Sequence, residues 1–407
     1  MHFLKLLRSK LINLLVQNPE ESTFYIGAKI VKNVGAYYDN TWAAVFHISR
    51  NFLTLLTGMM QFILQIIFNF NKIEKLTILE IIHFIFLYLF AISLSCGLLV
   101  RSRRFKSLYT LIKNEFGKET KSLTVEQQKV EKDASDFTHR FIKISLVLFY
   151  WACIFTISRR PLFERTSEMT LMNEGWMPFE VNTWFRYTVV CIFQTVVALN
   201  LATIFWALLA TYVTYSKQIC SQLEILSLYI KDTFDYNSPA LTETKSSKLT
   251  TAKYKKLRLK LIIQRHQVLL RCLNLFQETY SLLLFGVSFN CGLVMCTAIY
   301  MVTDPQSNFF LILEFVNLLV PELALTGCYC WFGQQMKDWW TRIGETVYDS
   351  SWYMEPITIQ KALLNMLTIS NKNKALKGAG LQEFSLKGSS ELLQASFTYF
   401  NMLKAAR

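Results

Sequence analysis

The chain has 407 residues, of which 52% are hydrophobic and only 18% are charged, and its formal net charge is +14. Soluble domains carry about 25% charged residues, whereas here the apolar surplus is concentrated in long uncharged runs. The composition therefore excludes a soluble enzyme, a secreted disulfide scaffold and a disordered regulator, and it predicts an integral membrane protein.

The first region, residues 1–41, begins with an apolar stripe between Phe3 and Leu15 that runs beside Lys5, Arg8 and Lys10. It has no continuous apolar core and no small-residue cleavage site, so it is not a signal peptide. We expect a cytoplasmic amphipathic helix that lies on the membrane surface or packs under a helical bundle.

Seven segments are candidate membrane-spanning helices, because a span needs about 20 mostly apolar residues. They are residues 51–71, 81–100, 141–158, 187–216, 279–303, 309–336 and 385–403. The sixth segment contains Pro321, and the seventh is the least apolar. The chain is thus predicted to be all-α, with spans one to four within residues 42–216, spans five and six within 279–336, and the last span within 385–407.

Basic residues alternate between the connections of these spans. Residues 101–143 and 217–272 each hold eleven Lys and Arg, and residues 337–387 hold seven, whereas residues 159–182 hold three and residues 301–308 hold none. Because Lys and Arg gather on the cytoplasmic side, the connections after spans two, four and six are predicted to be cytoplasmic. The N-terminus is then cytoplasmic and the C-terminus is extracellular.

The cytoplasmic side is predicted to be structured. Apolar residues recur at helical spacing from Ile219 to Ile230 and again from Leu259 to Phe276, on either side of a polar loop. Such stripes favour two helices that extend beyond the membrane and pack together. Residues 217–278 are therefore expected to form a cytoplasmic helical extension with its loop, and residues 337–384 a cytoplasmic anchor helix.

The C-terminal part carries three distinctive stretches: YDSSWYMEP at 348–356, LLNMLTISNKNKALKGAGLQEFSL at 363–386, and SFTYFNML at 396–403. Together they resemble the insect odorant receptor family. The resemblance implies no enzymatic activity and no cofactor or metal, but an odorant-gated, non-selective cation channel in the plasma membrane of sensory neurons. The related gustatory receptors share the pair formed here by Thr398 and Tyr399, and they remain an alternative.

The same resemblance implies the partners. An odorant-tuned subunit combines with the Orco co-receptor in a heterotetramer around a central pore. The co-receptor has a longer insertion between spans four and five, whereas the connection here, residues 217–272, is short. The chain is thus expected to be a tuning subunit that binds a small volatile hydrophobic ligand in the outer half of the membrane.

Candidate site residues follow from this resemblance and from depth along the spans. The ligand-binding candidates are His83, Phe84, Leu87, Phe149, Tyr150, Cys153, Tyr187, Val190, Gln194, Phe289 and Cys296. The pore and gate candidates are Gln394, Thr398, Met402 and Ala406. The subunit-interface candidates are Trp352 and Tyr353.

Each set has a simpler interpretation. Aromatic residues within spans commonly serve packing alone, polar residues of the last helix can bond neighbouring helices, and Trp352 and Tyr353 can belong to an aromatic belt at the membrane interface. In a different functional class, Pro321 and Glu322 could mark the broken helix of a transporter. Glu314, Glu322 and Arg186 are ionisable groups near membrane depth and therefore functional candidates.

Overall fold

The computed structural model describes residues 41–116, 123–163, 169–234, 251–372 and 374–405. The predicted N-terminal amphipathic helix and the gate candidate Ala406 thus lie outside the described residues. The elements are α3 (Thr41–Asn69), η1 (Phe70–Lys72), α4 (Lys75–Val100), α5 (Ser102–Phe116), α6 (Val125–Phe163), α7 (Trp184–Phe234), α9 (Thr251–Thr303), α10 (Phe309–Asp349), η3 (Trp352–Met354), α11 (Ile357–Ser370), β1 (Lys377–Gly378), β2 (Gln382–Glu383) and α12 (Leu386–Ala405). The all-α prediction is confirmed, since the two strands form only a short hairpin.

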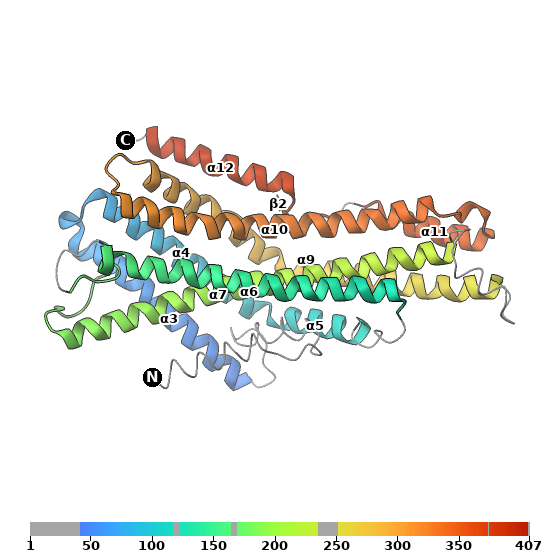
Figure 1. Ribbon diagram of the computed structural model, residues 1–407, viewed down its shortest axis with the longest axis horizontal. Coiled ribbons are helices and arrows are strands. Elements are labelled where there is room, and N and C mark those ends of the chain that lie inside the picture. The colour runs from blue at the N-terminus through green and yellow to red at the C-terminus, as the bar shows by residue number, and fades with distance from the viewer. Residues whose placement is uncertain (1–40, 117–122, 164–168, 235–250, 373, 406–407) are drawn as a thin grey trace.

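The described helices form an elongated bundle (Figure 1). One half contains α3, α4 and α12 together with parts of α6, α7, α9 and α10, and the other half contains α5 and α11. The longest helix, α9, has 53 residues and extends for about 80 Å at 1.5 Å per residue. A bilayer has a hydrocarbon core of about 30 Å, so α9 must project well beyond any membrane that it crosses.

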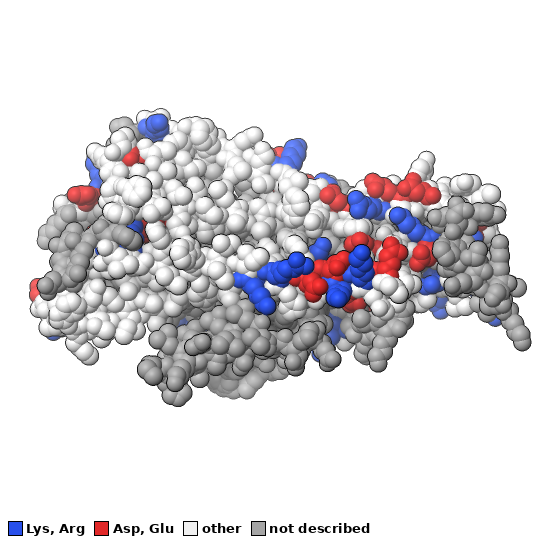
Figure 2. Space-filling model, viewed as in Figure 1, with Lys and Arg blue, Asp and Glu red and all other residues white. Residues whose placement is uncertain are grey.

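Charge divides the surface into the same two halves. On the face seen in Figure 2, Lys, Arg, Asp and Glu gather over the half that contains α5 and α11, whereas the half with α12 is almost uncharged except at its far end. Six described helices, α3, α4, α6, α7, α9 and α10, are long and apolar enough to span a membrane. The 20-residue α12 is not among them, so its crossing remains a prediction.

The projecting parts of α7 and α9 pack together, as the two apolar stripes predict. Ile219 and Leu223 of α7 and Leu269 and Phe276 of α9 are buried in one core. Helices α10 and α11 cover this pair, and the His266 ring stacks on Trp340 with 5.0 Å between ring centroids. The predicted anchor helix at 337–384 is divided in the structure, because α10 continues to Asp349 and α11 follows it after a turn.

A short hairpin connects this region to α12. Strand β1 pairs antiparallel with β2, with Lys377 opposite Glu383. The segment that follows β2 passes so close to α10 that a Cβ at Gly333 would overlap the carbonyl oxygen of Phe384. The absence of a side chain at Gly333 therefore lets the chain enter α12, which then packs against α9 and α10.

Candidate functional site

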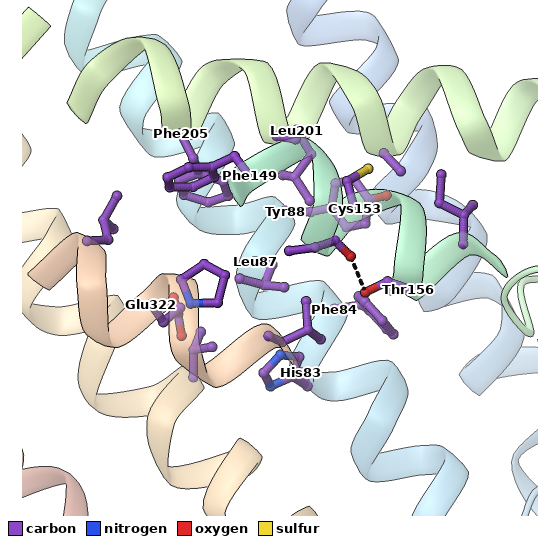
Figure 3. Close-up of a pocket in the computed structure, with 18 of the residues that line it drawn as sticks. His83, Phe84, Leu87, Tyr88, Phe149, Cys153, Thr156, Leu201, Phe205 and Glu322 are labelled. Atoms are coloured by element: carbon purple, nitrogen blue, oxygen red, sulfur yellow. Dashed lines mark hydrogen bonds between the residues drawn. The ribbon is translucent and has the colours of Figure 1, made fainter. Parts of the chain in front are cut away.

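A cavity of about 110 Å³ lies among α4, α6, α7 and α10. One residue of α9 and one residue from the α6–α7 connection complete its wall (Figure 3). The lining residues are His83, Phe84, Leu87, Tyr88, Phe149, Ala152, Cys153, Thr156, Ile157, Asn173, Ala198, Leu201, Ala202, Phe205, Val294, Leu318, Pro321, Glu322 and Leu325. Most are apolar, as expected of a site for a small organic molecule.

Helical spacing explains how the cavity arises. On α4, His83 and Leu87 are one turn apart and share a face. On the facing helices α6 and α7, small side chains at Ala152, Ala198 and Ala202 line the cavity. Because these methyl groups cannot reach the opposite wall, space stays open between the larger rings that bound it.

Two polar side chains in the wall retain unused hydrogen-bonding atoms. The His83 Nδ1 lies 2.8 Å from the Thr297 hydroxyl, and that hydroxyl donates its single hydrogen to the carbonyl of Val294 at 3.0 Å or of Leu293 at 3.2 Å. When the hydroxyl hydrogen goes to one of these carbonyls, Nδ1 is the donor to Thr297 and Nε2 is an acceptor. His83 Nε2 and Glu322 Oε2 are both buried, and neither has a hydrogen-bond partner in the described chain.

An ion-pair network that includes Glu80 of α4 lies next to the cavity. Arg159 of α6 lies 2.9 Å from Glu80 and also pairs with Glu314 of α10. Arg160 lies 2.9 Å from Glu80 and also pairs with Glu174 of the α6–α7 connection. The network therefore ties α4, α6 and α10 together around the cavity.

The α6–α7 connection is held over the cavity by a second contact. The Gln194 amide donates to the Asn173 carbonyl at 3.0 Å, and the Asn173 backbone N–H donates to Gln194 Oε1 at 3.4 Å. Asn173 lines the cavity, so Gln194 fixes one part of the wall without itself lining it.

Comparison with known proteins identifies the family. A family model described as 7tm odorant receptor matches residues 74–397, which is most of the chain and includes every cavity-lining residue. The chain belongs to the odorant receptor family. This membership favours neither the gustatory nor the transporter alternative. The transporter alternative also expected a broken helix at Pro321, whereas α10 runs through Pro321 without a break.

Solved structures agree with this membership at the level of the fold. The insect olfactory receptor OR5 from Machilis hrabei in complex with eugenol has a TM-score of 0.74 and 14% identity, with 94% of this chain and 98% of OR5 covered. A further structure of the same OR5 has a TM-score of 0.71 and 14% identity, with 100% and 99% covered. No curated protein matches the chain in sequence.

In this odorant receptor, five of the eleven predicted ligand-binding residues line the cavity. They are His83, Phe84, Leu87, Phe149 and Cys153. The candidates on α4 and those on α6 thus line the same cavity. The most informative contributor that the prediction of the pocket omitted is α10, which supplies Leu318, Pro321, Glu322 and Leu325. A carboxyl group within an apolar run was the available signal, and it marked Glu322 as a functional candidate and as part of a possible broken helix, but not as part of the pocket.

The other six candidates lie outside the lining. The Tyr150 hydroxyl is 2.8 Å from that of Thr203, and the Tyr187 hydroxyl donates to the Thr170 carbonyl at 3.2 Å. Phe289 is 65% exposed on α9. The remaining three are Gln194, which holds Asn173, and the buried residues Val190 and Cys296.

The pore and interface candidates of the receptor are outward-facing to different degrees. Gln394, Thr398 and Met402 are exposed on α12, on the side away from the buried Leu392, Ser396 and Phe400. Tyr353 is 65% exposed, whereas Trp352 is partly buried against its own chain's core.

Proposed function

We propose that this receptor is an odorant-tuned subunit of a ligand-gated, non-selective cation channel, and that its ligand occupies the cavity among α4, α6, α7 and α10. The observation that carries the proposal is the cavity itself, which combines an apolar wall with a few placed polar groups within an odorant receptor fold. OR5, which shares this fold, was solved in complex with eugenol, and this supports a small organic ligand here.

The pore is assigned to α12. Gln394, Thr398 and Met402 form an exposed stripe on this helix. The stripe would line a central pore if the α12 helices of several subunits surround one axis. Met402 is 64% exposed, and a ring of such apolar side chains excludes water and thereby closes a pore. In this arrangement α12 spans the membrane, with the N-terminus of the chain in the cytoplasm and its C-terminus outside.

The expected partners are Orco co-receptor subunits in a heterotetramer in the plasma membrane of sensory neurons. Aromatic residues are common anchors of protein interfaces, and η3 presents Tyr353 at the surface beside Trp352. The exposed Tyr353 is the stronger contact candidate, because Trp352 packs partly against the core of its own chain.

Currents from cells that express the receptor with and without the co-receptor test this function. We expect small volatile odorants to evoke cation currents in cells that contain both proteins and to evoke none in cells that contain the co-receptor alone. A receptor that reaches the cell surface with the co-receptor and yet passes no current with any odorant of a broad panel would contradict the proposal.

A further inference from the structure

We infer that the ligand of this receptor carries a basic amino group, and that Glu322 binds this group inside the cavity. The inference rests on the proposed function and specifies the chemical class of the ligand. It is carried by the position of Glu322, by the absence of a compensating cation among the described residues, and by a second unpartnered polar atom in the same wall.

Glu322 lies in the middle of the apolar part of α10. Its neighbours in the cavity wall include Leu318, Pro321 and Leu325, and Figure 3 shows it projecting from α10 while Phe149 and Phe205 occupy another side of the cavity. The residue is partly buried, but its Oε2 is fully buried and has no hydrogen-bond partner in the described chain. Burying such a group without a partner is unfavourable.

No basic side chain compensates Glu322 within the described residues, where it forms no ion pair. Two arginines of α6, Arg159 and Arg160, are engaged by Glu80, Glu314 and Glu174. An acidic group at membrane depth normally pairs with another group or serves a function. A basic ligand would supply the cation that the protein does not.

The second polar atom favours an amine over an alcohol. His83 Nε2 is buried and has no hydrogen-bond partner within the described residues, and it is an acceptor in the tautomer in which Nδ1 donates to Thr297. In that tautomer the wall presents two acceptors, Nε2 of His83 from α4 and the carboxylate of Glu322 from α10. A hydroxyl group carries one hydrogen, whereas a primary amine carries two and its ammonium form three.

The ion pair can form without any further reactant. If both groups arrive neutral, the Glu322 O–H bond breaks and an N–H bond forms on the amine nitrogen, which leaves a carboxylate beside an ammonium. If both groups are already charged, they pair directly. In either case the cavity holds no net charge. The cavity of about 110 Å³ is smaller than the apolar cavity of roughly 150 Å³ that is known to bind benzene, so the rest of the ligand can be no larger than a single ring and its entry requires the walls to adjust.

Three probes of one shape test the inference: benzylamine, benzyl alcohol and ethylbenzene, which differ only in an amino, hydroxyl or methyl group. Binding to the purified full-length receptor with its co-receptor is measured by calorimetry in lipid nanodiscs. We expect benzylamine to bind about 10- to 100-fold more tightly than ethylbenzene, the factor associated with a hydrogen bond to a charged group, and more tightly than benzyl alcohol. Equal binding of benzylamine and benzyl alcohol would overturn the inference.

Variants of Glu322 test whether this residue causes the preference for benzylamine. Glu322→Gln keeps the shape of the side chain but removes its acidity, so it should abolish the preference for benzylamine while ethylbenzene binds as before. Glu322→Asp retains the acid and should retain part of the preference. Glu345→Gln removes an exposed carboxylate from the same helix and should change nothing. A preference that survives in Glu322→Gln would place the amine elsewhere and refute the assignment.

The binding measurement tests the ligand class, and the current measurement tests the channel function, so the two can fail separately. An amine preference in binding, without current evoked by the amine or by any odorant of the panel, would contradict the channel function and leave the ligand class intact. Amine-independent binding together with odorant-evoked currents would contradict the ligand class and leave the channel function intact.

Discussion

At the scale of single residues, the least expected feature is a buried arginine close to the cavity. Arg159 has a side chain that is 2% exposed, and its partners Glu80 and Glu314 are 6% and 1% exposed. Charges can be buried in this way only when they are paired, because removing either partner leaves an uncompensated charge. The network thus holds α4, α6 and α10 in register next to the cavity that they enclose.

Replacing Arg159 with Gln should therefore destabilise the receptor by about 3–5 kcal/mol, the usual effect of breaking a buried pair. The measurement is the thermal unfolding midpoint of the purified receptor. Lys387→Gln is the matched control, because Lys387 is 88% exposed and pairs at 3.8 Å with Glu391. A pair on the surface contributes little. Equal midpoints for wild type and Arg159→Gln would show that the network is not structural.

The sequence predicted individual cavity residues only in part. Depth along a helix can be estimated from the ends of an apolar run, and it selected His83, Leu87 and Phe149, which line the cavity. The direction of a side chain around the helix turns by about 100° per residue, and the neighbours that fix this direction are not encoded locally. Phe289 was assigned to the pocket by depth, but it faces away from it.

At the scale of elements, apolar periodicity predicted the helices well. The stripe through Ile219 and Leu223 and the stripe through Leu269 and Phe276 are each helical and buried. Breaks were harder to place. Pro321 suggested a broken helix, yet α10 is continuous from Phe309 to Asp349, since packing on α7 and α9 outweighs one missing backbone hydrogen bond. This continuity brings Glu322 to the cavity.

The outward stripe of α12 leads to a prediction about the gate. Replacing Met402 with Ser should let water persist in a closed pore, and should raise the basal current or change ion selectivity while odorant potency changes less. The measurement is the current in cells that express the variant with the co-receptor. Wild-type basal current, permeation and gating at normal surface expression would remove Met402 from the pore.

At the scale of the whole molecule, the cavity and the proposed pore helix are connected by α9. Val294 of α9 lines the cavity, and a Cβ placed on Gly292, two residues earlier, would lie 4.0 Å from the side chains of Ser396 and Tyr399 of α12. Helix α10 likewise contacts α12. A ligand that moves α9 or α10 would thus act directly on α12, while the parts of α7, α9 and α10 that project beyond the cavity half remain packed together.

The central claim is that a ligand in this cavity opens a pore elsewhere in the assembly. Phe149→Ala and Phe289→Ala test it most directly. Both remove a phenyl ring from a helix that is long and apolar enough to span a membrane, but only Phe149 lines the cavity. Concentration–response curves for a small and a larger odorant are recorded for each variant with the co-receptor. We predict that Phe149→Ala changes the ratio of the two potencies by about 10-fold or more, with unchanged ion permeation, and that Phe289→Ala behaves as wild type. A changed ratio in Phe289→Ala, with none in Phe149→Ala at equal surface expression, would contradict the account.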